Sequence, residues 1–387
     1  MTTNPPPKIT PGVMSLLPLF YVGWSDSVLS PSEMDLIHEK IRKLEFLTDE
    51  ERETLVSWTD PQHPPSREIF KLWLSEMKRL TSHQTLDDKM SLVEIGIEMA
   101  RVMASKEDEH EWLSHETIEA LRDIESTLGV TDTGSLRAFL SRINRKVSPD
   151  RVDIVQPEKI TELLDGQYRD TRNRMRRLLT DPVFKLEYEH DKEEYRRKIL
   201  NWVKLMADQG LGSYAYPEEF GGKNDPGHHI TVFEMLGYHD LSLAVKFGVQ
   251  FGLFGSAIYY LGTEHHHEKY LSKLGSGELL GCFAMTETDH GSNVKGLETT
   301  LTYDATDKTI TVNTPHLNAG KEYIGNALHS THAVVFGQLL VNGEEHGIHA
   351  VIVRIRNDRH ELMKGVRVED NGYKMGLNGI DNGKIWF

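Results

Sequence analysis

The sequence predicts a multidomain α+β protein in which two helical modules come before a β-rich module. Up to about residue 280, apolar residues recur at spacings of three and four, as in helices that bury one face. After Gly281 the period changes to alternation and β-branched runs follow, and both features indicate strands. We therefore expect a disordered tail at residues 1–14, an all-helical module at residues 15–150, a second helical module at residues 158–280 and a β-domain at residues 281–387.

Proline and helix-capping residues mark the start of the first module. Four prolines fall within the first 12 residues, which contain little that could pack, so this tail is expected to be disordered. Ser30 with Glu33, and Thr48 with Glu51, each form the Ser/Thr-x-x-Glu pattern of a capping box. Helices are therefore expected directly after Ser30 and Thr48.

The opening of this module, GWSDSVLSPSEMDLI, resembles the first helix-turn of tellurite-resistance-type helical domains. That resemblance implies a possible metal site at Asp26 and Glu33, although Ser27 stands where the family has glycine. We prefer the alternative interpretation, a solvated turn followed by a helix cap, because the resemblance covers one short stretch.

A polar, helix-poor stretch between about Val147 and Pro157 indicates a linker to the second module. An apolar stripe from Tyr195 to Met206 then predicts an amphipathic helix that stops at Gly210. The segment YPEEFGG is expected to be a loop, and the apolar residues 230–261 are expected to form buried helices.

Alternating apolar residues predict a β-hairpin early in the third module. They run from Leu297 to Tyr303, residues 304–308 supply a turn, and a return strand begins at Ile310. Residues 333–341 and 348–355 are apolar, β-branched runs, which suit strands packed on both sides.

Composition limits the classes of function. The 387 residues include 44 Lys plus Arg against 59 Asp plus Glu, a net charge of −15 that disfavours a nucleic-acid surface. Cys282 is the single cysteine, which excludes an intrachain disulfide and fits a reducing compartment. Because the sequence shows no apolar run of membrane-spanning length and no secretory signal at its start, we expect no membrane span and a cytoplasmic protein.

Glycine and small hydroxyl residues cluster in FAMTETDHGSN, residues 283–293, where helices give way to strands. Such a turn brings backbone N–H groups and the hydroxyls of Thr286 and Ser292 toward a planar polar ligand or a phosphate, although the same pattern also closes ordinary turns. The segment KEYIGNA follows the predicted hairpin and is expected to lie beside this loop. Tyr323 within it is either one wall of a flat-ring pocket or core packing.

Three segments in order, YPEEFGG, LGTEHHHEKYLSKLGSGELLGCFAMTETDHGSNVKGLETT and KEYIGNA, resemble the acyl-CoA dehydrogenase and acyl-CoA oxidase superfamily. The resemblance covers about residues 165–387. It implies a helical domain, a β-barrel-like domain and a second helical bundle, with FAD between the last two and a fatty acyl-CoA substrate that reaches the flavin. It also implies a homodimer or a higher homo-oligomer for the full-length protein.

The resemblance assigns flavin contacts to two segments. Thr286 matches the threonine that hydrogen-bonds the isoalloxazine, and Ser292 matches the serine near flavin and substrate. Gly325 stands where dehydrogenases usually have threonine, and one lost neutral hydrogen bond is worth about 1 kcal/mol, too little to abolish binding. The expected FAD-binding residues are Phe283, Met285, Thr286, Gly291, Ser292, Tyr323, Ile324 and Gly325, and Ser292 is also the expected substrate contact.

The implied reaction is α,β-dehydrogenation of a fatty acyl-CoA to a trans-2-enoyl-CoA in fatty-acid β-oxidation, with a glutamate as base. The segments HGS and GLETT favour an oxidase, which uses oxygen as electron acceptor, over a dehydrogenase, which passes electrons to a flavoprotein. The family's glutamate lies in a C-terminal helical bundle that we expect to be absent from this chain, so we expect the base beyond Phe387 and no catalytic residue before it. Glu287 and Glu298 have no such role in the family. The alternative is a non-catalytic derivative that acts as a binding or assembly module.

We expect no metal site. His265, His266 and His267 are neighbours on a predicted helix, where adjacent side chains point in different directions. They cannot chelate one ion without other partners.

Overall fold

The computed structural model describes residues 9–107, 110–130, 134–143, 157–187, 189 and 191–387. The chain divides into two compact units, Met1–Lys185 and Leu186–Phe387. The division falls inside the region expected to form the second helical module. The reason is that Asp181 accepts hydrogen bonds from the N–H and hydroxyl of Ser32, so the segment before Lys185 packs with the first unit. The expected linker at residues 147–157 lies almost entirely outside the described residues.

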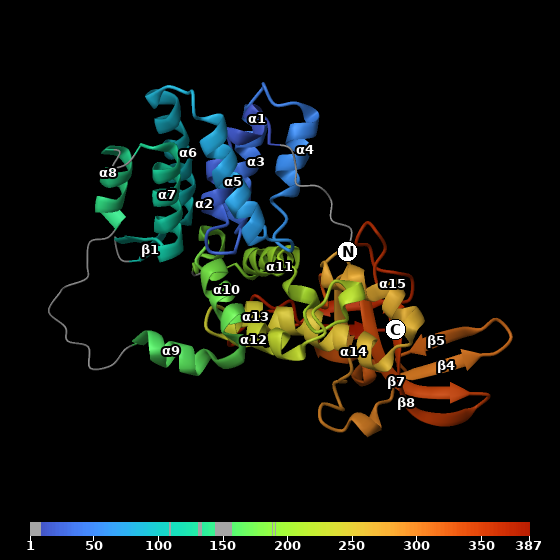
Figure 1. Ribbon diagram of the computed structural model, residues 1–387. Coiled ribbons are helices and arrows are strands. Elements are labelled where there is room, and N and C mark those ends of the chain that lie inside the picture. The colour runs from blue at the N-terminus through green and yellow to red at the C-terminus, as the bar shows by residue number, and fades with distance from the viewer. Residues whose placement is uncertain (1–8, 108–109, 131–133, 144–156, 188, 190) are drawn as a thin grey trace. The chain divides into compact units, whose positions relative to one another are not determined.

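The first unit is a helical bundle with one short β-hairpin (Figure 1). Its helices are α1 (Pro11–Met14), α2 (Leu17–Gly23), α3 (Pro31–Lys43), α4 (Asp49–Ser57), α5 (Arg67–Leu80), α6 (Leu86–Met103), α7 (His115–Leu128), α8 (Gly134–Ile143), α9 (Pro157–Asp165) and α10 (Arg169–Leu179). The hairpin strands β1 (Ser105–Glu107) and β2 (His110–Trp112) pair antiparallel and add a small β element to the module expected to be all-helical.

Helix α2 is central to the bundle because every residue in it is buried. It contacts α3, α5, α6 and α7. Phe20 on α2 lies edge-on to Trp58 with 5.5 Å between ring centroids, and Trp73 lies 5.3 Å from Trp58. A helix that is apolar on all sides has no amphipathic period, and it is stable because the surrounding helices cover it completely.

Both predicted capping boxes are present, at the starts of α3 and α4. The expectation of a disordered tail at residues 1–14 is wrong for residues 9–14. Thr10 caps α1 by accepting the N–H of Val13, and Ile9 is buried against the bundle. Residues 1–8 lie outside the described part of the chain.

The second unit begins with helices and ends with strands, as the change of sequence period predicts. Its helices are α11 (Lys192–Asp208), α12 (Pro226–Gly237), α13 (Leu241–Phe247), a π-helical segment (Gly248–Phe254), α14 (Gly255–Leu261) and α15 (Glu264–Gly275). Among the described residues, the continuous stretch Leu241–Leu261 is long and apolar enough to cross a membrane by length and composition, contrary to the expectation that no such run exists. However, 61% of its apolar window is buried inside the protein, as in a core helix.

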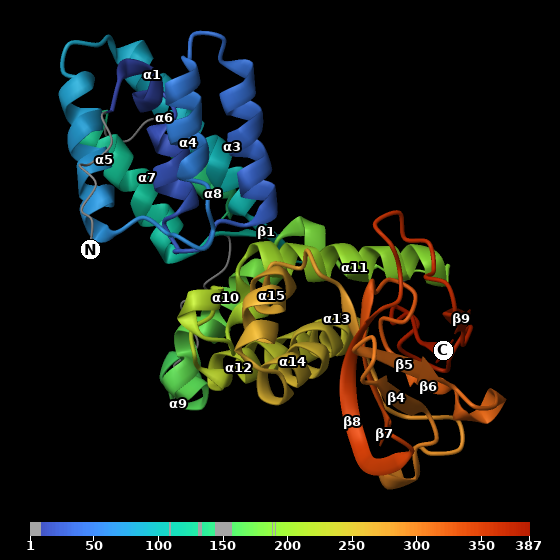
Figure 2. The same ribbon diagram turned by 90° about the vertical axis from the view of Figure 1, so that its right-hand side faces the viewer.

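Two sheets form the rest of the second unit (Figure 2). In the larger sheet, strand β7 (His332–Val341) pairs antiparallel with β8 (Glu344–Arg354) and parallel with both β3 (Gly281–Ala284) and β4 (Thr300–Asp304). Strand β5 (Thr309–Asn313) pairs antiparallel with β4, which confirms the predicted hairpin. The smaller sheet has the order β6 (Lys321–Ile324), β10 (Gly383–Trp386) and β9 (Arg367–Asp370).

The β-barrel-like form expected for this region is wrong in one respect, because the described strands do not close into a barrel. Strands β3, β5 and β8 each pair with a single neighbouring strand, and no two of these three pair with each other. Strand β7 is continuously buried only from Ala333 to Gly337, and β8 contains no buried residue. The apolar run at residues 348–355 therefore does not form a strand covered on both sides. The expectation failed because apolar composition does not show which faces of a strand are packed against other elements.

Buried ion pairs join the helical part of this unit to its strands. Lys246 Nζ in α13 lies 2.5 Å from Asp381 Oδ1 and donates to Asn326 Oδ1 at 3.0 Å. Arg196 in α11 donates two hydrogen bonds to the carboxylate of Asp370 in β9, at 2.9 and 2.8 Å. These contacts hold β9, the segment after β6 and the segment before β10 against the helices.

Candidate functional site

The two segments expected to bind flavin lie side by side. Thr286 follows β3 and donates its hydroxyl hydrogen to the carbonyl of Glu322 in β6 at 2.8 Å. In return, the N–H of Glu322 donates to the carbonyl of Thr286 at 3.0 Å. A third hydrogen bond runs from Thr288 Oγ1 to Glu322 Oε2 at 2.5 Å. The hairpin between the segments therefore returns the chain to the loop, as the sequence predicts.

A buried ion pair stabilises this junction. Lys321 is fully buried, and its Nζ lies 2.9 Å from Glu287 Oε1 and 3.0 Å from the carbonyl oxygen of Met285. Glu287 also accepts the N–H groups of Glu298 and Thr299 at 2.8 and 2.9 Å. Burial alone would raise the pKa of Glu287, but these hydrogen bonds and the ion pair outweigh burial and lower it. Glu287 is thus an ionised structural carboxylate and not a base that is free to take a proton.

The loop after this ion pair presents unpaired backbone donors. Gly291, Ser292 and Asn293 are exposed, and within the described part of the chain their N–H groups donate no hydrogen bond. Consecutive free N–H groups on an exposed turn suit a phosphate or a carbonyl at the edge of a ring. The loop therefore supplies donors of the kind that a dinucleotide cofactor needs.

Tyr323 is exposed and has an unusual backbone conformation. Its side chain is 71% exposed, which rules out core packing, one of the two interpretations left open by the sequence. Its φ of +60° is a left-handed conformation that costs energy in a residue other than glycine. The side-chain amide of Asn382 donates to the Tyr323 carbonyl at 3.0 Å and helps to hold this backbone in place.

Other residues expected at the flavin have mixed surroundings. Phe283 packs on Phe336 with 4.8 Å between ring centroids, Met285 is half-buried, and Ile324 is buried. The hydroxyl hydrogen of Thr286 is already donated to the protein backbone. Only the lone pairs of its oxygen therefore remain for a ring, where they would accept an N–H.

An apolar groove beside Gly325 was missed by sequence reasoning. It has a volume of about 400 Å³ and is lined by His229, Ile230, Phe233, Val245, Gly248, Val249, Gly252 and Leu253. A Cβ on Gly325 would lie 3.0 Å from Val249 Cγ2, so the second flavin segment touches the groove wall. The sequence signal was the pair of glycines four residues apart in an apolar helix. A Cβ on Gly248 would lie 2.7 Å from the Phe233 ring, so glycine is needed for this close approach.

Potential metal ligands also gather near the loop. One ligand atom each from Glu287, His290 and Glu298 lies within 4.8 Å of the others. Glu298 Oε2 lies 2.8 Å from His316 Nε2 and 3.7 Å from His290 Nε2. Because Lys321 already neutralises Glu287, ordinary charge pairing accounts for this group, and we assign no metal to it.

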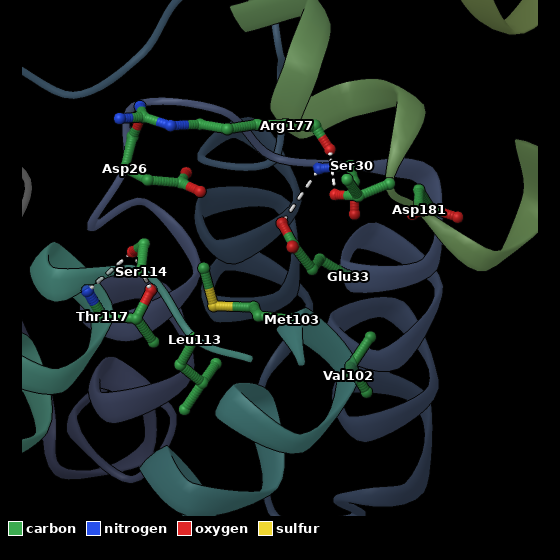
Figure 3. A pocket seen from close by; sticks show the side chains of 11 residues that line it. Asp26, Ser30, Glu33, Val102, Met103, Leu113, Ser114, Thr117, Arg177 and Asp181 are labelled. Carbon is green, nitrogen blue, oxygen red and sulfur yellow. Dashed lines mark hydrogen bonds between the residues drawn. The ribbon is translucent and has the colours of Figure 1, made fainter. Parts of the chain in front are cut away.

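A separate cavity lies within the first unit (Figure 3). Its volume is about 250 Å³, and it brings together Asp26 and Glu33, whose carboxyl groups face each other across it. The expected helix cap is present and Ser27 in the turn before it is exposed, but Glu33 is only 6% exposed and does not face solvent. Burial raises the pKa of Asp26 to about 6 and raises that of Glu33 well above its ordinary value.

Family models account for most of the chain after the N-terminal bundle. Residues 166–278 match the model of the acyl-CoA dehydrogenase N-terminal domain, and residues 282–387 match that of the acyl-CoA dehydrogenase middle domain. The chain belongs to the acyl-CoA dehydrogenase superfamily. Within it, the acyl-CoA dehydrogenase N-terminal domain begins just before α10, a helix that packs with the first unit.

Relatives of this chain in the acyl-CoA dehydrogenase superfamily are named acyl-coenzyme A oxidases. Acyl-coenzyme A oxidase 3, peroxisomal, of Arabidopsis thaliana is 46% identical over 202 residues, which are 52% of this chain and 30% of the relative. Acyl-coenzyme A oxidase 2 of Yarrowia lipolytica is 37% identical over 239 residues, 59% of this chain and 32% of the relative. The crystal structure of acyl-coA oxidase3 from Yarrowia lipolytica aligns with a TM-score of 0.53 at 33% identity, over 60% of this chain and 33% of that one. The chain thus spans about a third of the length of these relatives.

Three relatives from Arabidopsis thaliana are named peroxisomal: acyl-coenzyme A oxidase 3, putative acyl-coenzyme A oxidase 3.2 and acyl-coenzyme A oxidase 2. This finding overturns the cytoplasmic location expected from the sequence. The expectation rested on finding neither a secretory signal nor a membrane-spanning run, and neither observation tests for a peroxisomal address.

Proposed function

We propose that this chain supplies the flavin- and acyl-binding region of an FAD-dependent acyl-CoA oxidase located in peroxisomes. The reaction converts a fatty acyl-CoA to a trans-2-enoyl-CoA in fatty-acid β-oxidation, with oxygen as the electron acceptor. One observation carries the proposal. The pairing of Thr286 with Glu322 joins the loop of free N–H groups to the segment with the exposed Tyr323, and Gly325 in that segment touches the apolar groove.

The two paired segments would hold FAD. The N–H groups of Gly291 and Ser292 can donate to its phosphates or ring carbonyls, and the Thr286 oxygen can accept a ring N–H. The exposed ring of Tyr323 offers a flat apolar wall. When bound, FAD supplies the oxidising chemistry by accepting a hydride equivalent from the substrate β-carbon. The role of these residues is to bind and orient.

The apolar groove would take the fatty acyl chain. Three of its large side chains, Ile230, Phe233 and Leu253, are between 42% and 64% exposed in this structure, so an acyl chain would cover apolar surface that now faces water. Burial of each additional CH₂ is worth about 0.8 kcal/mol. Because Gly325 contacts Val249 in the groove wall, the acyl chain would end close to the flavin segment.

A base for the α-proton is not assigned to the residues described here. Glu287 is held by Lys321 and two backbone N–H groups, and Glu298 contacts His316. We propose that the base is a glutamate in a C-terminal helical domain of the full-length oxidase, and that the full-length protein is a homodimer or larger homo-oligomer. The oxidase names of the relatives support oxygen over a flavoprotein as acceptor.

The test is spectroscopic. The full-length protein is purified with its flavin, and palmitoyl-CoA is added under anaerobic conditions. We expect bleaching of the flavin absorbance, followed by peroxide formation when oxygen is admitted. Ser292→Ala should slow bleaching, whereas Ser272→Ala, a change at an exposed serine on α15, should not. A full-length protein that binds no flavin, or whose flavin no acyl-CoA bleaches, would contradict the proposal.

A further inference from the structure

A histidine interrupts the apolar groove of the second unit. Among the described residues that line this groove, only His229 in α12 has polar atoms in its side chain. Its ring stacks on Phe247 with 5.5 Å between the ring centroids and an interplanar angle of 25°. The glycines and apolar side chains around it suffice to hold a hydrocarbon chain, so a histidine in this wall requires an explanation.

The imidazole ring of His229 makes no hydrogen bond to the described part of the chain. Its Nδ1 is buried and unpaired, and no described group donates to or accepts from Nε2 either. Burial lowers the pKa of His229 below its ordinary value, so near pH 7 the ring is neutral, with one nitrogen a donor and the other an acceptor. Because a polar atom away from water is unfavourable without a hydrogen bond, a ligand that supplies one to this ring gains affinity.

Two glycines of the π-helical segment Gly248–Phe254 show which ring nitrogen a ligand can reach. A Cβ on Gly252 would lie 3.6 Å from His229 Nε2, and no other atom from outside this helical turn would lie within 4 Å of it. Gly248 is covered instead, because a Cβ there would lie 2.7 Å from the Phe233 ring. A ligand atom seated over Gly252 would therefore meet His229 Nε2 first.

We propose, on the basis of the proposed function in which this groove holds the acyl chain, that His229 selects acyl chains with a hydroxyl group within the chain. The hydroxyl would lie over Gly252 and hydrogen-bond His229 Nε2. A hydroxyl group is the matching chemistry because it both donates and accepts, and so fits either tautomer of the neutral ring. A carboxylate at this place is disfavoured, because the described residues that line the groove include no Lys or Arg to neutralise it.

The position of Gly252 along the groove places the hydroxyl away from the reacting carbons. Gly325 of the second flavin segment approaches the groove at Val249. Gly252 lies three residues beyond Val249 in the same helical segment, close to one turn further along the groove wall. The hydroxyl would therefore lie several carbons beyond the β-carbon, where it contributes to selection of the substrate and takes no part in the oxidation.

Anaerobic bleaching of the flavin in the full-length holoenzyme tests this selectivity. The substrates are palmitoyl-CoA and its 6-, 8-, 10- and 12-hydroxy derivatives, and the second-order rate constant of bleaching is measured for each. For the hydroxy derivative that reacts fastest, His229→Leu should lower the ratio of its rate constant to that of palmitoyl-CoA at least tenfold, because leucine leaves the hydroxyl without a partner. The matched control is His228→Leu, which alters the neighbouring histidine of α12 outside the groove and should leave this ratio unchanged.

Two outcomes would overturn the proposal, and they are distinguishable. If palmitoyl-CoA bleaches the flavin but His229→Leu lowers the ratio for none of the hydroxy derivatives, the acyl-CoA function stands and the role of His229 fails. If neither palmitoyl-CoA nor any hydroxy derivative bleaches the flavin, the proposed function and the role of His229 fail together. If His229→Leu does not fold, His229→Phe serves as the second variant, because it keeps a ring to stack on Phe247 and lacks both nitrogens. It should show the same tenfold fall.

Discussion

The buried ion pair between Lys321 and Glu287 is expected to hold the two proposed flavin segments together, and Lys321→Met tests this. Methionine keeps most of the side-chain volume but removes the contacts to Glu287 at 2.9 Å and to the Met285 carbonyl at 3.0 Å. Glu287 would remain buried and ionised without its counter-charge. Loss of one partner of a buried pair costs about 3–5 kcal/mol, so local stability should fall by that amount.

Hydrogen exchange followed by mass spectrometry measures this effect where it occurs. Because the chain has two units, global unfolding need not be a single transition, whereas exchange reports the opening free energy of a chosen segment. Peptides that cover residues 283–288 and 320–324 should exchange faster in Lys321→Met. Peptides from the first unit should be unaffected.

A double-mutant cycle separates the pair from other effects. Adding Glu287→Gln to Lys321→Met removes the stranded charge, so the double variant should be less destabilised than the sum of the single variants by about 2 kcal/mol or more. The same cycle at the exposed pair Arg367 and Glu369 should show coupling close to zero. Additive effects at Lys321 and Glu287 would refute this reasoning.

Three further predictions concern single positions. Asp26→Asn should stabilise the first unit by about 3 kcal/mol at pH 7, because the charged form is disfavoured by a pKa of about 6 against 3.8. That gain should shrink to about 0.6 kcal/mol at pH 4 and disappear only below the unfolded pKa of 3.8, where both states are protonated. Urea unfolding should show no such change for the exposed Asp35→Asn. Tyr323→Gly should leave the free energy of unfolding of the second unit unchanged or raise it by about 1 kcal/mol, because glycine adopts a φ of +60° without strain. A clear fall in the melting temperature of this variant would contradict that account. Gly325→Ala should destabilise the second unit by about 1–3 kcal/mol through the 3.0 Å approach to Val249, and Val249→Ala in the same chain should restore part of the loss in a thermal melt.

Features that depend on neighbouring residues could be predicted from the sequence. The capping boxes at Ser30 and Thr48 depend on residues three positions apart, and both are present. The β4–β5 hairpin depends on a turn between two alternating runs, and its strands pair as expected. The ordered motifs from YPEEFGG to KEYIGNA identified the superfamily because their spacing is constrained over the whole region.

Features that depend on distant partners could not be predicted. Lys321 and Glu287 are 34 positions apart, and nothing local to either residue shows that both are buried. The groove arises where α12 meets the stretch Leu241–Leu261, so its apolar residues resembled ordinary core. Glu33 was expected at a solvated turn because a charged residue usually is exposed, and its burial depends on α6, α7 and α10.

The central claim is that the paired segments at Thr286 and Tyr323 form the FAD site, and FAD titration of the flavin-free full-length protein tests it most directly. Flavin fluorescence should be quenched on saturable binding, and Tyr323→Leu should weaken binding by roughly 2–10-fold, the value of one aromatic contact. Tyr238→Leu, which alters a tyrosine that is 81% exposed on another part of the second unit, should bind as the unaltered protein does. Absence of binding, or equal affinity in the two tyrosine variants, would contradict the claim.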